Sequence, residues 1–134
     1  MIVGVGIDVV EIKRLERAIE RFGDRFLQRV FCFNEIETCL KKTDPYPGLS
    51  ARFAAKEAFS KALGTGFRNG LRLTDICVKQ DQLGAPYLFL KGAAQRFLNK
   101  MGISKVHVSL SHERSFAVSV VILEKQISYN RLCF

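Results

Sequence analysis

Two acidic residues occupy positions where a carboxylate needs a chemical reason. Asp8 interrupts the apolar run of residues 2–7, and a carboxylate buried there without a partner would be costly. Glu57 lies in an Ala-rich segment that favours helix, and Lys61 follows one turn later on the same face. Mg²⁺ is typically held by one or two carboxylates with phosphate oxygens and waters, and a nearby lysine can neutralise a leaving phosphate. The three residues therefore predict metal-assisted chemistry at a phosphate.

Each of these residues also has a simpler explanation. Asp8 could cap a helix that begins near Glu11, because Asp is a favoured N-cap residue. Glu57 and Lys61 could form an exposed ion pair on the surface of their helix. From the local sequence alone, both explanations stay open.

A third polar group stands at the end of an expected strand. Ser109 and Ser111 alternate with apolar neighbours and so share one side of the strand, and His112 follows them. Two hydroxyls and an imidazole could bind phosphate, or they could form the polar outer face of a sheet. Gly64-Thr65-Gly66, after the Ala-rich helix, requires no more than a glycine C-cap.

The elements that must position these residues follow from hydrophobic periodicity. We expect strands at 2–9, 73–79, 87–90, 106–110 and 115–123, helices at 12–22, 26–42, 49–63 and 92–101, a loop at 41–48 and a turn at 81–86. Strands gather late in the chain and pair as hairpins, which predicts an α+β fold with a long helix on a mainly antiparallel sheet. We expect one domain, 1–125, and a C-terminal tail, 126–134.

The formal net charge of +8 suggests an anionic partner, or only a solvated basic surface. In the helix expected at 12–22, the apolar face is formed by Ile12, Leu15, Ile19 and Phe22. Opposite it lies a basic stripe of Arg14, Arg17, Arg21 and, if the helix continues, Arg25. A small nucleic-acid-binding protein is the main alternative class, but the stripe lacks interleaved aromatic residues and a recognisable binding motif.

The cysteines and the N-terminus bear on the compartment. Cys32, Cys39, Cys77 and Cys133 form no CxxC pair, so we expect reduced thiols of a cytoplasmic protein that mostly fill the core. The N-terminal residues do not have the pattern of a signal peptide. No apolar run approaches the roughly 20 residues of a membrane span, so we expect no membrane partner.

Taken together, these motifs resemble one family. Gly6-Ile7-Asp8, the helical run from Phe53 to Lys61 and Ser109-Leu110-Ser111-His112 are similar to the phosphopantetheinyl transferases. The run from Arg52 to Gly66 resembles the small holo-acyl carrier protein synthase branch of that family. The resemblance extends from residue 2 to about residue 124. In the turn at 81–86 the chain departs from the family, which often has Asn in place of Leu83 and a basic residue in place of Ala85.

The resemblance implies an activity and a set of roles. The enzyme would transfer 4′-phosphopantetheine from coenzyme A to a serine of apo-acyl carrier protein and release 3′,5′-ADP. Asp8 and Glu57 would hold Mg²⁺, or Mn²⁺, at the coenzyme A pyrophosphate, and Lys61 would contact that phosphate. The residues implied for the nucleotide are Arg52, Lys61, Gly64, Thr65, Gly66, Pro86, Ser109, Ser111 and His112.

The resemblance also implies partners and an assembly. The basic first helix, with its arginines, would meet the acidic carrier protein, because complementary charge speeds encounter and fixes orientation. The small members of the family are homotrimers with active sites between subunits. Either Glu57 or a water on the metal would act as base. Intact Asp8, Glu57 and Lys61 argue against a further alternative, a catalytically inactive interaction module.

Overall fold

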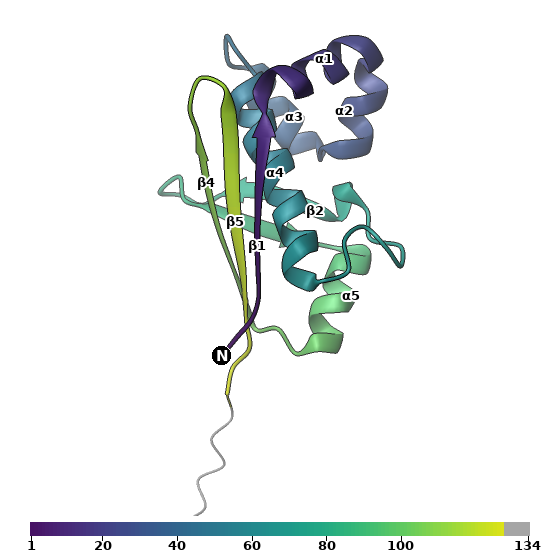
Figure 1. Ribbon diagram of the computed structural model, residues 1–134, viewed down its shortest axis with the longest axis vertical. Helices are drawn as coiled ribbons and strands as arrows, with labels where there is room; N and C mark the ends of the chain where they lie inside the picture. The colour runs from purple at the N-terminus through teal and green to yellow at the C-terminus, as the bar shows by residue number, and fades with distance from the viewer. Residues whose placement is uncertain (128–134) are drawn as a thin grey trace, which may run out of the picture.

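The structure is a computed structural model that describes residues 1–127 (Figure 1). In chain order its elements are β1 (Ile2–Glu11), α1 (Ile12–Phe22), α2 (Asp24–Val30), α3 (Phe33–Leu40), α4 (Tyr46–Leu63), the 3₁₀ turn η1 (Leu73–Asp75), β2 (Ile76–Gln80), β3 (Pro86–Leu90), α5 (Gly92–Met101), β4 (Lys105–His112) and β5 (Phe116–Glu124). This mixture of helices and antiparallel strands confirms the predicted α+β class.

A three-stranded antiparallel sheet in the order β1-β5-β4 carries α4 along one of its faces (Figure 1). Within residues 1–127 the first strand therefore pairs with the last. Helix and strand approach closely because β1 presents Gly4 and Gly6 to the helix. A Cβ atom at either position would overlap the carbonyl oxygen of Ala62 or Ala58. Glycine at these two positions thus sets β1, with Asp8, directly against α4.

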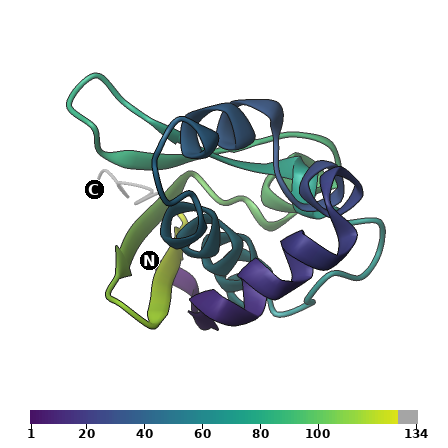
Figure 2. The ribbon, with the colours of Figure 1, turned by 90° about the horizontal axis from the view of Figure 1, so that it is seen from above.

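Helix α4 lies at the centre of the molecule, as the view in Figure 2 shows. The three-stranded sheet lies on one side of it, and the β2–β3 hairpin and α3 lie on another. A buried cluster joins these layers, with Phe59 of α4, Ile76 of β2, Ala94 of α5 and Val121 of β5 among its members. Burial on several sides holds α4 in place as the scaffold for its polar residues.

Three expectations about the helices were wrong in detail. The single helix expected at 26–42 is two helices, α2 and α3, because Phe31 and Cys32 have extended backbones between them. Helix α4 begins at Tyr46, inside the expected loop, since a proline is tolerated in the first turn of a helix, where its missing N–H costs nothing. Phe22, expected on the apolar face of α1, is 55% exposed, and the Arg21 guanidinium lies over its ring at 5.2 Å.

The expectation of free thiols was also wrong for two cysteines. Cys32, at the start of α3, and Cys77, in β2, form a disulfide. Cys39 is a buried free thiol, as expected for a residue that fills the core. Cys133 and most of the expected tail lie outside the described residues. Within residues 1–127, no helix is both long and apolar enough to cross a bilayer.

Candidate active site

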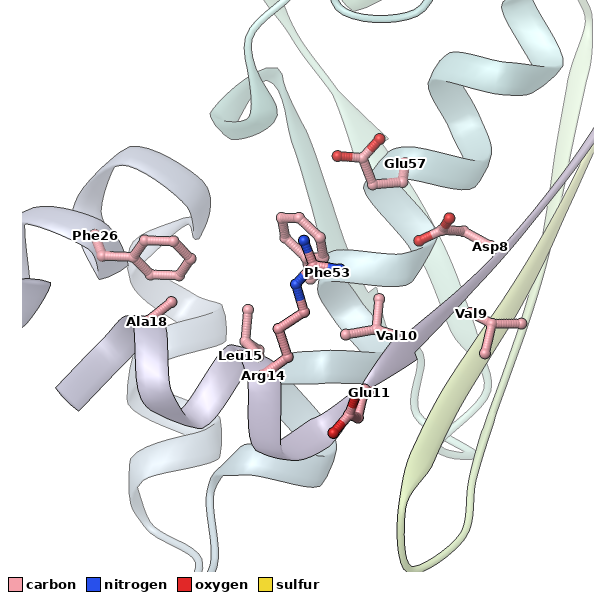
Figure 3. Close-up of a pocket in the computed structure, with 10 residues that line it drawn as sticks. All are labelled: Asp8, Val9, Val10, Glu11, Arg14, Leu15, Ala18, Phe26, Phe53 and Glu57. Carbon is pink, nitrogen blue, oxygen red and sulfur yellow. The ribbon is translucent and has the colours of Figure 1, made fainter. Parts of the chain in front are cut away.

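Asp8 and Glu57 come from different elements and line one pocket (Figure 3). Asp8 projects from the side of β1 that faces α4, and Glu57 projects from α4. Lys61, one turn after Glu57, donates from Nζ to Oδ1 of Asp8 at 2.9 Å and to the carbonyl of Ile7 at 3.0 Å. The fold therefore brings together the three residues that the sequence analysis singled out for phosphate chemistry.

This geometry excludes both simpler explanations, a helix cap for Asp8 and a surface ion pair between Glu57 and Lys61. Strand β1 continues to Glu11, so Asp8 lies inside a strand, and Glu11 occupies the N-cap position of α1. Lys61 forms its ion pair with Asp8 across two elements, which differs from the surface pair with Glu57 that helical spacing also allowed. Asp8 and Lys61 thus connect β1 to α4 at the point where Glu57 projects.

The surroundings of Glu57 disfavour its charged form. Burial raises the pKa of Glu57 above its ordinary value, the Asp8 carboxylate raises it further, and Lys61 opposes the shift. No group of three or more His, Cys, Asp or Glu side chains gathers within residues 1–127. Two carboxylates without nitrogen or sulfur ligands match a hard cation such as Mg²⁺, whose other positions are taken by phosphate oxygens and waters.

A pocket of about 370 Å³ opens beside the carboxylates. Its apolar walls come from α1, α2 and α4 and include Leu15, Ala18, Phe26 and Phe53, and Arg14 extends from α1 toward Phe53 (Figure 3). Sequence reasoning missed this pocket, because apolar residues at helical spacing predict core. The pocket gives an apolar group space within reach of the carboxylates.

Arg52, implied for the nucleotide, lies on another face of α4. Arg52 is five positions before Glu57 in the chain. Five positions on a helix correspond to a rotation of about 140° around the helix axis. Its Nη1 donates to the carbonyl of Gly48 at 3.1 Å, and its buried Nε has no hydrogen-bond partner within residues 1–127. This Nε atom is itself covered, so a ligand would have to meet other atoms of the guanidinium. A second hollow, of about 360 Å³, is lined by Asn34, Thr38, Arg52, Val78, Lys79, Gln80 and Tyr87.

Two other segments implied for the nucleotide lie at the ends of elements of the fold, Gly64–Gly66 after α4 and Pro86 at the start of β3. Gly64 is the left-handed C-cap of α4, as the simpler explanation predicted, and the N–H of Gly66 donates to the carbonyl of Ser60 at 3.2 Å. Thr65 lies between them, with its hydroxyl 3.2 Å from the Gly66 carbonyl. Pro86 opens β3 after the expected turn. A nucleotide role for these residues stays a prediction.

The segment Ser109–His112 lies away from the carboxylates within one chain. Strand β5 separates its strand, β4, from β1. The register aligns Leu110, Ser119 and Asp8 on the face that α4 covers, so the two serines on either side of Leu110 point from the opposite face. His112 ends β4 at the exposed hairpin turn. One chain alone does not bring this segment to Asp8.

The basic stripe is present but divided. Arg14, Arg17 and Arg21 are exposed on α1, and Gly23 ends this helix, so Arg25 belongs to α2. Arg25 is exposed as well. Arg14 also lines the pocket beside the carboxylates. The basic surface therefore borders the candidate active site.

Residues 4–121 match the model of one protein family, the 4′-phosphopantetheinyl transferase superfamily. The chain belongs to this superfamily. The alternative of a small nucleic-acid-binding protein is therefore set aside. Among members of the superfamily, a protein from Syntrophus aciditrophicus named holo-[acyl-carrier-protein] synthase is 52% identical over 124 residues, which cover 92% of this chain and 97% of that protein.

Solved structures of the superfamily share the fold. A holo-[acyl-carrier-protein] synthase from Neisseria meningitidis matches with a TM-score of 0.86 and 38% identity, over 93% of this chain and all (100%) of that one. A synthase from Bacillus anthracis, solved in complex with CoA (3′,5′-ADP), matches with a TM-score of 0.78 and 36% identity, over 94% of this chain and 99% of that one. The resemblance seen in the motifs is thereby confirmed.

Proposed function

We propose that this chain transfers 4′-phosphopantetheine from coenzyme A to a serine of an apo-acyl carrier protein and releases 3′,5′-ADP, the activity of a holo-acyl carrier protein synthase. The observation that carries the proposal is the meeting of Asp8, Glu57 and Lys61 beside a pocket in a member of this superfamily. Relatives that match almost end to end bear the synthase name, and one solved neighbour holds CoA (3′,5′-ADP).

Asp8 and Glu57 are the residues that would hold a metal ion, and we assign Mg²⁺, with Mn²⁺ as a substitute. The assignment rests first on the donor set of two carboxylates. It rests also on the raised pKa of Glu57, which burial raises most and the Asp8 carboxylate raises further. When bound, the metal would neutralise charge on the coenzyme A pyrophosphate.

The chain's own residues orient the reaction and handle its proton. The serine hydroxyl oxygen of the carrier forms a bond to the phosphorus that bears pantetheine, while the bond from that phosphorus to the 3′,5′-ADP oxygen breaks. Glu57, with its raised pKa, accepts the hydroxyl proton. Lys61, held beside Asp8, faces the departing phosphate. Alignment and charge neutralisation supply most of the acceleration.

The nucleotide end of coenzyme A needs further phosphate donors. Arg52 supports this role because its hollow also contains Lys79. Gly64–Gly66, Pro86 and Ser109–His112 are assigned to the nucleotide by resemblance. Because Arg52 faces away from Glu57 and the serines lie on the opposite face of the sheet, one chain does not assemble all of these groups.

We therefore propose a homotrimer whose active sites are shared between subunits. The uncovered face of the sheet supports this assembly, because Val5, Ile7 and Val9 of β1 are each exposed by 58% or more. An apolar sheet face of this kind requires a cover. The same face carries Ser109 and Ser111, so a neighbour that covers it can receive these hydroxyls.

The carrier protein is proposed to dock on α1. Arg14, Arg17 and Arg21 provide positive charge beside the pocket, and Arg25 extends it onto α2. An acidic helix is complementary to this surface. We also propose a cytoplasmic location. The thiol pool of that compartment would tend to reduce the Cys32–Cys77 disulfide.

One assay tests the proposed function. The protein is incubated with coenzyme A, Mg²⁺ and an apo-acyl carrier protein, and the carrier is weighed by intact mass spectrometry. We expect the mass of one phosphopantetheine to be added, the reaction to stop with EDTA, and Mg²⁺ or Mn²⁺ to restore it. Full transfer in metal-free buffer would remove the metal from the proposal.

Substitutions then test the residues. Asp8→Asn and Glu57→Gln should each lose most of kcat while circular dichroism stays unchanged, and Lys61→Ala should lose turnover more than stability. The matched control is Glu37→Gln, since Glu37 is an exposed carboxylate paired with Lys41 on α3. Wild-type rates in the Asp8 and Glu57 variants would exclude these residues from the site.

A further inference from the structure

Lys56, the residue before Glu57 on α4, is fully buried together with Glu35 of α3. Its ammonium donates to Oε1 of Glu35 at 2.7 Å, to the carbonyl of Leu73 at 3.1 Å and to the carbonyl of Ile76. An ammonium has three protons to donate, and all three have acceptors here. None of the proposed catalytic or binding roles uses this side chain.

Both carboxylate oxygens of Glu35 accept hydrogen bonds as well. Oε1 also accepts the backbone N–H of Cys32 at 2.8 Å, and Oε2 accepts that of Val78 at 3.1 Å. Cys32 opens α3, and the disulfide to Cys77 joins it to β2, next to Val78. The acceptors of the Lys56 ammonium are thus part of one cross-linked unit made of α3, η1 and β2.

Stability alone does not explain this buried pair. Taking two charges out of water is expensive, and apolar residues of similar volume often stabilise a core as well or better. Burial lowers the pKa of Lys56, and the neighbouring Glu35 carboxylate counters that effect. The pair differs from apolar packing because hydrogen bonds restrict both distance and angle. Three fixed acceptors therefore define where the Lys56 side chain, and the helix that carries it, must lie.

The other side of α4 packs closely on β1. There Ala58 and Ala62 meet the glycines of β1, and Lys61 binds the Ile7 carbonyl and Asp8. On a helix, an advance of one residue corresponds to about 100° of rotation and 1.5 Å of rise. A small rotation or slide of α4 would therefore carry Glu57 and Lys61 away from Asp8.

We propose that Lys56, anchored by Glu35, is a positioning residue that sets the rotation and height of α4 and so holds Glu57 and Lys61 against Asp8. The inference rests on the proposed roles of Glu57 and Lys61. Lys56 itself contacts neither substrate nor metal, and it acts through the helix that it fastens.

The main test removes both buried charges at once, with Glu35→Gln and Lys56→Met in one chain. We expect the protein to fold with a lower thermal midpoint, since no buried charge is left unpaired but the carbonyls of Leu73 and Ile76 lose their donor. We expect kcat to fall by at least about tenfold, because a misplacement of about 1 Å can cost a hundredfold. Mn²⁺ affinity, measured by calorimetry without substrate, should weaken by about tenfold. The KM for the carrier should not change, since the carrier is proposed to dock on α1.

If the double variant does not fold, a second variant tests whether Lys56 positions α4. Glu35→Asp keeps the charge pair but shortens the side chain by one methylene, so it should draw Lys56 toward α3 and lower kcat and Mn²⁺ affinity in a folded protein. Ser50→Ala is the control, because Ser50 is a buried α4 residue whose hydroxyl has no partner within residues 1–127. It should behave as the wild type.

Two results would overturn the inference. One is wild-type kcat and Mn²⁺ affinity in the folded double variant, and the other is wild-type behaviour of Glu35→Asp if the double variant does not fold. Failure of the proposed function is visible separately, since the wild-type protein would then transfer no phosphopantetheine, and failure of the role of Glu57 alone would leave Glu57→Gln with normal activity and Mn²⁺ binding. An inactive Glu57→Gln beside normal anchor variants would reject only the positioning role.

Discussion

At Glu57, the needs of catalysis and of stability oppose each other. Burial is the largest cause of its raised pKa, and the Asp8 carboxylate is the next. Because the folded chain holds this proton more tightly than the unfolded chain, stability is lost as pH rises from the unfolded pKa through the folded one. Above that window the metal-free protein carries a carboxylate that folding disfavours.

We therefore predict that Glu57→Gln is more stable than the wild type in metal-free buffer at pH 7. Glutamine is a neutral substitute of the same shape, so it removes the cost of the buried charge. The difference should shrink as pH falls toward the ordinary carboxyl pKa of about 4.3, where the wild type is protonated as well. Urea unfolding between pH 4 and pH 8 in EDTA measures it. A Glu57→Gln protein that is less stable throughout would contradict the prediction.

At the residue scale, the sequence singled out three side chains that lie together in the fold, but it did not predict which of them pair. Asp8 stood out because a carboxylate is costly in an apolar strand, and Glu57 because Lys61 follows it one helical turn later. The pairing of Lys61 with Asp8 spans 53 residues, and helical spacing suggested Glu57 instead. Lys56 was missed altogether, because lysines in helices are mostly exposed and its acceptor lies 21 residues away on α3.

At the scale of elements, α1 carries the surface proposed for the carrier protein. Exposed ion pairs contribute only about 0.2–1 kcal/mol each, so a single substitution should have little effect. Reversing two charges, with Arg14→Glu and Arg21→Glu, should repel an acidic carrier and raise its KM strongly, while the KM for coenzyme A stays nearly constant. Steady-state kinetics at two salt concentrations would show both effects.

The control for this experiment lies on α5. Arg96→Glu with Lys100→Glu changes the net charge by the same amount at exposed positions on a helix away from the proposed carrier surface (Figure 1). The α5 variant should keep the wild-type KM for the carrier. Equal losses in the two double variants would mean that net charge, and not the surface on α1, governs the encounter.

The disulfide between Cys32 and Cys77 makes a separate prediction for α3 and β2. It closes a loop with a sequence separation of 45 residues, and such a cross-link typically contributes about 2–4 kcal/mol by restricting the unfolded chain. Reduction with dithiothreitol should lower the free energy of unfolding by about that amount. Denaturant melts of the oxidised and reduced protein provide the measurement, with Cys32→Ala, Cys77→Ala as the control that should not respond to the reductant. Equal melts in both redox states would show that the bond does not stabilise the fold.

Elements defined by local periodicity were predicted well, and elements defined by distant contacts were not. Helices α1 and α5 and the late strands lie where alternation and helical spacing placed them. The break between α2 and α3 escaped prediction because Glu35, which accepts the Cys32 N–H there, also binds Lys56 of α4. The disulfide escaped for a related reason, since chain folding and not cysteine spacing brings Cys32 to Cys77.

At the scale of the whole molecule, two sets of predicted site residues lie on opposite faces of the sheet. Asp8, Glu57 and Lys61 meet on the helix side of the sheet, and Ser109 and Ser111 point from the opposite side. A closed ring of three subunits related by rotation can join the two sets at each interface. The expected mass in light scattering is about three times 15.1 kDa.

Shared sites predict that two inactive variants can rescue each other. Glu57→Gln damages one set, and Ser111→Ala with His112→Ala damages the other. Mixed assemblies, made by unfolding and refolding the two proteins together, should recover activity, because an interface that takes each half from the undamaged subunit is intact. A mixture of Asp8→Asn with Glu57→Gln should recover none, since both changes fall in the same set. Recovery in both mixtures, or in neither, would argue against sites shared in this way.

The pairing of β1 with β5 also determines when a nascent chain can acquire its active site. Residues 2–11 leave the ribosome more than 100 residues before their hydrogen-bonding partners, residues 116–124. At about 5–20 residues per second, the apolar first strand waits on the order of ten seconds with an unpaired edge, and such edges promote aggregation and chaperone binding. A chain that stops before residue 116 therefore contains Asp8, Glu57 and Lys61, yet lacks the strand that pairs with β1 and holds Asp8 in place.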